Sequence, residues 1–148
     1  MNAGRECECE INFMSGSKAC EICGNDVHPL AYLCKRCKDL INRGRKANKN
    51  ARIQALKQVW DKHGFFRCYY SKVRLVEDNP EDPRYLTFDH RTPRQEDDIV
   101  VAAALVNDMK SDMSEDEFKN MILQLANSYK GGTFDESVFN VKHWKRHA

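Results

Sequence analysis

Residues 85–93 read Tyr-Leu-Thr-Phe-Asp-His-Arg-Thr-Pro, and this stretch decides how the rest of the chain is interpreted. The aromatic and β-branched residues of 85–88 predict a strand that ends at the adjacent Asp89 and His90. Side chains at the end of a strand lie next to a loop, where binding and catalytic residues are often found. We therefore take the Asp89-His90 pair as the first candidate for chemistry.

Several predicted elements follow this pair. Residues 99–101 (Ile-Val-Val) are β-branched and predict a second strand, although the alanines that follow allow a helix to begin almost anywhere in this region. Asn107 lies 17 residues after His90 and precedes the segment Asp-Met-Lys-Ser-Asp. Ser114 and Glu117 have the spacing of a capping box, which predicts the start of another helix. A Gly-Gly pair at 131–132 predicts the end of that helix.

On the N-terminal side, residues 43–52 carry five basic residues and no acidic one. They are typical of a basic linker that enters a helix, and the apolar residues between 53 and 60 have helical spacing. A glycine follows residue 63 and is a natural helix stop, so we expect this helix to span roughly 49–63. The aromatic and β-branched stretches 65–70 and 72–76 then predict two short strands that pair as a hairpin.

Four of the seven cysteines form two Cys-x-x-Cys pairs separated by ten residues. They are Cys20, Cys23, Cys34 and Cys37. This spacing lets four thiolates converge tetrahedrally on one Zn²⁺, and four protein ligands leave no open position for catalysis, so we expect a structural zinc site. The alternatives are a redox Cys-x-x-Cys motif or buried apolar thiols, and redox motifs rarely occur as two spaced pairs.

Other residues near the cysteine pairs have more than one interpretation. Gly24 follows Cys23 and is expected to allow the close backbone approach that such a turn needs. His28 could replace one of the four ligands. The pair Cys7 and Cys9 could join or duplicate a metal site, although a single Cys-x-Cys in a polar segment is more often unligated. Cys68 lies in a predicted strand and is most simply a packed core residue.

Length and composition limit the class of protein. A chain of 148 residues with 41% hydrophobic and 31% charged residues is long enough for one compact domain and a small additional module. No apolar run reaches the roughly 20 residues that cross a bilayer, and the N-terminus lacks the blocks of a signal peptide. We therefore expect an intracellular protein, in the cytoplasm of a bacterial or phage-infected cell, with no membrane partner.

The charges are unevenly distributed along the chain. Residues 1–75 hold 15 Lys/Arg against 7 Asp/Glu, whereas residues 76–148 hold 9 against 15. A basic first half suggests a polyanionic partner, and an acidic second half can solvate a surface or hold cations.

A family resemblance becomes specific when these elements are taken in order. The Asp-His pair after an apolar strand, then Asn-x-x-Lys-Ser-Asp and a Ser-Glu-Asp-Glu-Phe helix start, resembles the motif of HNH endonucleases, also called His-Me finger or ββα-metal nucleases. The resemblance covers residues 66–125 and not the cysteine pairs. It implies that 99–101 is the second strand, that a helix starts near Ala104, and that two strands and this helix hold one divalent cation. The expected fold class is α+β, a small ββα-metal core with flanking helices and an N-terminal zinc-knuckle module.

The resemblance also implies roles for individual residues. His90 would be the general base that activates water, since an unperturbed imidazole has a pKa of about 6.5, close to neutral pH. Asp89 and Asn107 would hold the cation, and their hard oxygen atoms suit Mg²⁺ or Mn²⁺. The family has an asparagine nine residues before the ligand asparagine, where this chain has Asp98. Asp98 could hold the loop that carries the base by accepting backbone hydrogen bonds, but its carboxylate cannot donate as an amide would. Asp97, the preceding residue, is the alternative for this role.

The expected partner is DNA, most simply double-stranded. Basic residues beside the cysteine pairs could neutralise phosphates, and a lysine one helical turn after Asn107 could do the same. The residues expected to contact DNA are Arg43, Arg45, Lys46, Lys49, Arg52 and Lys110.

We therefore predict a flexible leader over 1–17, a four-cysteine zinc module with a basic linker over 18–48, and a nuclease domain over 49–148, with a homodimer as one assembly to consider. The predicted activity is metal-dependent hydrolysis of DNA to 5′-phosphate and 3′-hydroxyl ends. The alternative is a non-catalytic zinc-containing DNA-binding or adaptor protein whose HNH fold is degenerate through the change at Asp98. Phage, mobile-element and host-defence settings are compatible with either.

Overall fold

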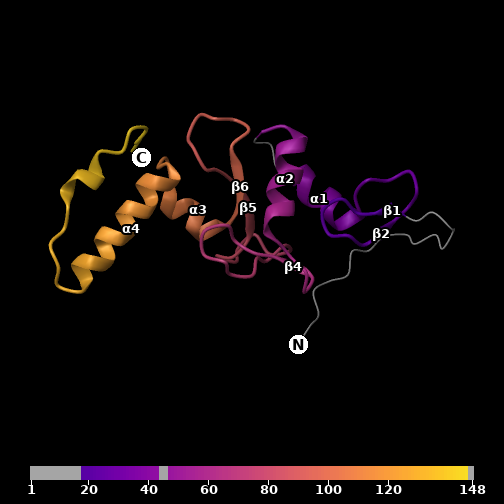
Figure 1. Ribbon diagram of the computed structural model, residues 1–148, viewed down its shortest axis with the longest axis horizontal. Coiled ribbons are helices and arrows are strands. Elements are labelled where there is room, and N and C mark those ends of the chain that lie inside the picture. The colour runs from indigo at the N-terminus through magenta and orange to yellow at the C-terminus, as the bar shows by residue number, and fades with distance from the viewer. Residues whose placement is uncertain (1–17, 44–46, 147–148) are drawn as a thin grey trace.

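A computed structural model describes residues 18–43 and 47–146 (Figure 1). Within these residues the protein is mixed α+β, with helices and small two-stranded antiparallel sheets. The predicted leader over 1–17, with Cys7 and Cys9, and the predicted DNA contacts Arg45 and Lys46 lie outside the described residues.

The cysteine segment folds as a strand pair followed by a helix. Strands β1 (Lys18–Ala19) and β2 (Asp26–Val27) pair antiparallel, and the first Cys-x-x-Cys turn lies between them. Helix α1 (Lys35–Arg43) starts directly after Cys34, whose carbonyl accepts a hydrogen bond of 2.9 Å from the Lys38 amide. The second Cys-x-x-Cys pair is therefore held by the first turn of a helix.

Helix α2 (Lys49–Val59) begins at Asn48, whose side-chain oxygen caps the helix by accepting a hydrogen bond from the backbone. The helix is shorter than the predicted span of 49–63. Trp60 takes an extended conformation and begins strand β3 (Trp60–Asp61), which pairs with β4 (Phe65–Phe66). The rings of Trp60 and Phe66 lie edge to face, 4.9 Å apart. Packing of this aromatic pair outweighs the local helical spacing.

The hairpin expected over 65–70 and 72–76 is present but irregular. Arg67 and Arg74 form an isolated antiparallel bridge, and the Leu75 amide donates to the Phe66 carbonyl at 2.9 Å. The Tyr69 amide instead donates to the carbonyl of Val101 at 2.8 Å, so the hairpin lies against the next sheet. Its Cys68 is fully buried, which confirms the expectation of a core residue.

Strands β5 (Leu86–His90) and β6 (Ile99–Ala103) confirm the two strands predicted around the Asp-His pair. They pair antiparallel, with Phe88 opposite Val101 and His90 opposite Ile99. All residues of β6 are buried, because α2 packs against this strand. Helix α3 (Ala104–Lys110) follows β6 without a loop, as the expected start near Ala104 requires.

Helix α4 (Glu115–Tyr129) begins at the predicted capping box. The Glu117 amide donates to Ser114 Oγ at 3.2 Å, and the Ser114 amide donates to Glu117 Oε1 at 2.9 Å. The helix ends before Gly131, which has a φ of 82°. The chain then turns back through a short 3₁₀ helix, η1 (Glu136–Phe139), and segment 140–146 returns toward the start of α4 (Figure 1).

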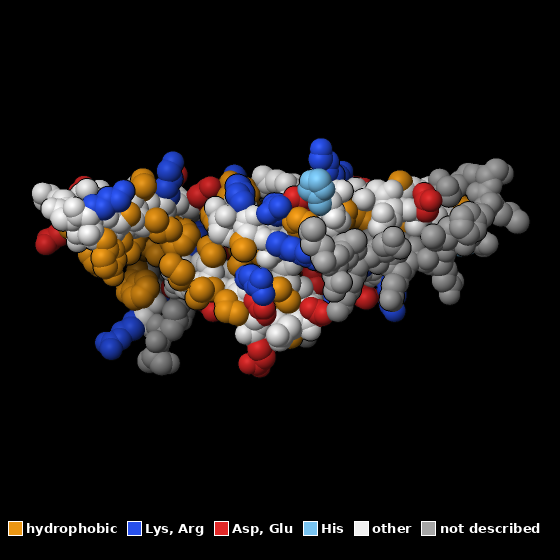
Figure 2. Space-filling view, turned by 90° about the horizontal axis from the view of Figure 1, so that it is seen from below, with side chains coloured by type: hydrophobic (Ala, Val, Ile, Leu, Met, Phe, Trp, Pro, Cys, Tyr) orange, Lys and Arg blue, Asp and Glu red, His pale blue; other side chains and the backbone are white. Residues whose placement is uncertain are grey.

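One continuous hydrophobic cluster joins the cysteine segment to the strands and includes Cys37, Leu56, Phe66 and Val101. The predicted boundary at residue 48 therefore does not coincide with a gap in the core. Several exposed hydrophobic side chains gather over α4 and η1, at one end of the molecule (Figure 2), whereas Leu30 and Tyr32 are exposed in the cysteine segment. Among the helices of the described residues, none is long and apolar enough to cross a bilayer.

Candidate functional site

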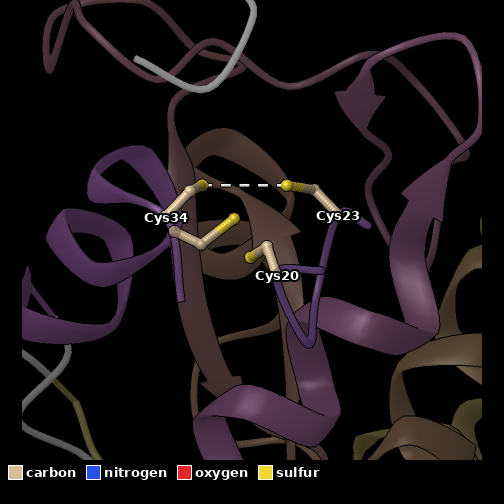
Figure 3. A group of neighbouring side chains, drawn as sticks. Cys20, Cys23 and Cys34 are labelled. Carbon is tan, nitrogen blue, oxygen red and sulfur yellow. Dashed lines mark hydrogen bonds between the residues drawn. The ribbon is translucent and has the colours of Figure 1, made fainter. Parts of the chain in front are cut away.

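The two Cys-x-x-Cys pairs meet in one cluster of buried thiols (Figure 3). Its members are Cys20, Cys23, Cys34 and Cys37, whose sulfur atoms all lie within 4.8 Å of one another. None of the four forms a disulfide, and the sulfur atoms of Cys23 and Cys34 are 3.7 Å apart. Four sulfur ligands placed tetrahedrally at about 2.3 Å from a zinc ion would be separated by about 3.8 Å. The cluster therefore has the geometry to bind one structural zinc ion.

Deprotonation of Cys20 is favoured in the cluster, and this favours metal binding. Hydrogen bonds from Cys23, and then from Cys34 and Cys37, lower the pKa of the Cys20 thiol far below its ordinary value, against the burial that raises it. Because the thiolate is the form that binds metal, the neighbouring thiols favour the ligand form of Cys20.

The backbone explains how the first pair forms. The Gly24 amide donates to the Cys20 carbonyl at 2.9 Å, which closes a tight turn. Gly24 has a φ of +76°, whereas no heavy atom lies within 4 Å of the position that its Cβ would take. The turn therefore needs glycine for its conformation, and the expectation of a close backbone approach is wrong. His28 is not among the clustered ligands, and its Nδ1 accepts a hydrogen bond from the Leu30 amide at 3.2 Å.

Three other candidate residues, Asp89, His90 and Asn107, line one pocket of about 240 Å³ at the end of β5, whereas Asp98 and Lys110 do not line it. Asp89 and His90 come from β5, and Asn107 comes from α3. They meet because β6 runs antiparallel to β5 and α3 follows β6 directly. The other lining residues are Pro93, Arg94, Ser111, Asp112, His143 and Lys145.

The Asp89 carboxylate is buried, with only 3% of the residue exposed. The Tyr70 hydroxyl donates to its Oδ2 at 2.7 Å, and the Lys110 ammonium nitrogen lies 3.2 Å from the same oxygen. Burial, followed by the hydrogen bond to Asp89, raises the pKa of Tyr70 beyond its ordinary range, so the phenol stays protonated and remains a donor. Asp89 thus has one neutral and one cationic partner.

The position of Lys110 differs from the sequence prediction, which expected it to contact a DNA phosphate. Its side chain is fully buried rather than exposed on a helix face. In addition to its ion pair with Asp89, its ammonium group donates to the His90 carbonyl at 2.7 Å. Because α3 is short and packs beside β5, its last turn lies against the end of that strand. In this position Lys110 holds the Asp89-His90 pair, and its burial argues against a phosphate contact.

Asn107 is oriented by β5. Its side-chain nitrogen donates to Thr87 Oγ1 at 3.1 Å, and the Thr87 hydroxyl donates in turn to the Ala102 carbonyl at 2.8 Å. Because the nitrogen of the amide points at β5, its carbonyl oxygen lies on the opposite side of the amide group. The Asn107 side chain also carries a carbonyl oxygen, which is one of the oxygen ligands that a hard cation binds.

Asp98 closes the loop that follows His90. Its carboxylate accepts a hydrogen bond from the Arg91 guanidinium at 2.9 Å, and its backbone carbonyl accepts one from the Arg91 amide, also at 2.9 Å. The loop is thus held by a side-chain ion pair together with a backbone bond, and not by backbone donors to the carboxylate as expected. Asp97 accepts a hydrogen bond from the Asn48 side chain at 2.8 Å, which ties the same loop to the start of α2.

Sequence reasoning did not identify Arg94, in the loop after β5, as a residue of this pocket, and it also missed His143 and Lys145. His143 and Lys145 both lie in segment 140–146, whose residues have no clear periodicity.

The described basic residues expected to contact DNA have different surroundings. Arg43 donates to the Glu77 carbonyl, and its guanidinium lies 5.6 Å from the centre of the Tyr85 ring. Arg52 donates to the Ala47 carbonyl at 2.7 Å. Lys49 is exposed at the start of α2. A DNA contact through these side chains remains a prediction.

Comparisons with protein-family models, with curated proteins and with solved structures give no match for this chain.

Proposed function

We propose that this protein is a metal-dependent endonuclease of the HNH type that hydrolyses DNA phosphodiester bonds. The observation that supports this proposal is that Asp89, His90 and Asn107, from two separate elements, line one pocket of about 240 Å³. An imidazole beside two oxygen ligands is the set of groups that phosphodiester hydrolysis uses. In the same proposal, the four-cysteine cluster holds Zn²⁺ and stabilises the fold.

The chemistry of the donors fits a hard divalent cation. Asp89 offers a carboxylate, and Asn107 offers the amide oxygen that its bond to Thr87 leaves on the other side of the group. Two protein oxygens leave further positions for water and phosphate, as Mg²⁺ and Mn²⁺ sites usually do. When bound, the cation would supply positive charge to the phosphate and to the leaving 3′-oxygen.

His90 is the general base in this proposal. Its imidazole accepts a proton from the attacking water, a role that histidine commonly has in hydrolytic enzymes. The 2.7 Å hydrogen bond from Lys110 to the His90 carbonyl fixes the backbone at this position. The ion pair between Arg91 and Asp98 closes the loop that begins directly after His90. These contacts fix the backbone that carries the base, and a rigid backbone favours a defined catalytic geometry.

A second candidate is a non-catalytic zinc-containing DNA-binding or adaptor protein with a degenerate HNH fold. The observation that favours it is the 3.2 Å ion pair between Lys110 and Asp89. A buried ammonium already balances the carboxylate that a divalent cation would need, so Asp89 is a weaker ligand than an unpaired aspartate.

A plasmid assay separates the two candidates. Supercoiled plasmid is incubated with the protein and Mg²⁺ or Mn²⁺, and nicked and linear products are measured on a gel. We expect cutting by the wild type and no cutting by His90→Ala. His63→Ala is the matched control, because His63 is an exposed histidine outside the pocket.

The outcomes of this assay distinguish the nuclease from the adaptor. Cutting that persists in His90→Ala, or without a divalent cation, contradicts the proposed mechanism. A gel shift of DNA with no cutting under either cation favours the adaptor. End-labelling of the products is expected to find 5′-phosphate and 3′-hydroxyl ends.

A further inference from the structure

We propose that segment 140–146 binds the phosphodiester group on which the site acts, through the side chains of His143 and Lys145. This inference rests on the proposed nuclease function. Both side chains line the pocket that contains Asp89, His90 and Asn107, although they lie far along the chain from all three. The C-terminal segment therefore completes a site whose other walls come from β5, its following loop and α3.

Two hydrogen bonds hold the segment at the start of α4. The Lys142 amide donates to Glu117 Oε2 at 2.8 Å, and the Lys145 amide donates to Asp112 Oδ2 at 3.2 Å. These bonds lie on either side of His143, so its backbone is held at both ends. Glu117 also forms the capping box of α4, and its one carboxylate therefore ties the C-terminal segment to the helix start.

The charges on the pocket wall favour a phosphate group. Arg94 from the loop after β5 and Lys145 from the C-terminal segment are cationic, and His143 adds an imidazole. Two acidic residues also line the pocket. Asp89 is paired with a buried lysine, and Asp112 accepts the backbone hydrogen bond from Lys145. The cationic and donor groups of the wall match the several acceptor oxygens of a phosphodiester.

Neighbouring residues in the segment provide a control and a reporter. Lys142 is exposed and is not among the pocket-lining residues, so it differs from Lys145 in position and not in chemistry. Trp144 lies between the two proposed contacts and is 58% exposed. Its fluorescence is therefore expected to change when DNA occupies the pocket.

The test measures DNA binding separately from cleavage. A short fluorescent duplex is titrated with the His90→Ala protein over a series of salt concentrations, without added Mg²⁺ or Mn²⁺. Each phosphate contact contributes about 0.9 to the slope of log K against log salt. We expect Lys145→Ala to reduce this slope by about 1 and Lys145→Arg to retain it. His143→Ala is expected to weaken binding, and Lys142→Ala is expected to match its parent.

The outcomes distinguish this inference from the nuclease proposal. An unchanged slope in Lys145→Ala, or equal losses in Lys145→Ala and Lys142→Ala, overturns the inference even when His90-dependent cutting is observed. Absence of DNA binding by the parent protein overturns it as well. A Lys145-dependent slope without any cutting supports the phosphate contact and contradicts the nuclease. Thermal unfolding of each variant shows whether the fold is retained.

Discussion

Replacing Lys110 by methionine tests the buried ion pair on which the site depends. Methionine keeps the length and the apolar stem of lysine but removes the ammonium group. Lys110 is fully buried and Asp89 is 3% exposed, so the ammonium group is removed from a largely buried environment. The carboxylate would keep the 2.7 Å hydrogen bond from Tyr70 and lose its cation.

The expected loss of stability in Lys110→Met is large for a single substitution. Removing one partner of a buried ion pair ordinarily costs about 3–5 kcal/mol, because the other charge remains buried. This is a substantial part of the roughly 5–15 kcal/mol by which most domains are stable. With a urea m value of about 2 kcal/mol per molar, the unfolding midpoint would fall by about 1.5–2.5 M at an unchanged m value.

Two further variants make the result interpretable. Lys119→Met removes an exposed lysine from α4 and is expected to change the free energy of unfolding by less than about 0.5 kcal/mol. Combining Lys110→Met with Asp89→Asn removes both charges and is expected to recover much of the stability. A loss below about 1 kcal/mol in Lys110→Met, or a double variant no more stable than the single one, would refute the reasoning.

Three other predictions concern the metal centre and the capping box. Zinc measured by mass spectrometry should approach one ion per chain and be lost in Cys20→Ser, whereas Cys68→Ser, outside the cluster, should retain it. Gly24→Ala should weaken zinc retention in a chelator competition and lower stability by about 1 kcal/mol, since alanine is strained at a φ of +76°; equal retention would contradict the need for glycine. Against burial that raises it, hydrogen bonds from the backbone of Ser114 and Lys142 lower the pKa of Glu117. The ionised Glu117 carboxylate therefore stabilises the folded state fully above its unfolded pKa of about 4.3, and this stabilisation is lost as the pH falls through its lower pKa in the folded state. Because Glu117→Gln has no carboxylate to protonate, its free energy of unfolding should fall less steeply with acid than that of the wild type.

The sequence by itself determined the features that depend on local spacing. Two Cys-x-x-Cys pairs predict a four-thiol cluster because each tight turn places two sulfur atoms on one side of the backbone. The capping box at Ser114 and Glu117 joins groups three residues apart, so neighbouring residues alone define it. The strands around Asp89 follow from residue types, whereas the helix start near Ala104 is implied by the family resemblance and not by the residues alone.

Only the tertiary structure decided which side chains share the pocket and which are buried. Lys110 reads as an exposed helical lysine, and its burial depends on α3 packing beside β5. Trp60 has helical spacing, but its contact with Phe66 ends the helix. His143 reaches the pocket because the chain turns back after α4. These outcomes depend on contacts between residues distant in sequence, and periodicity carries no information about such contacts because it describes one segment at a time.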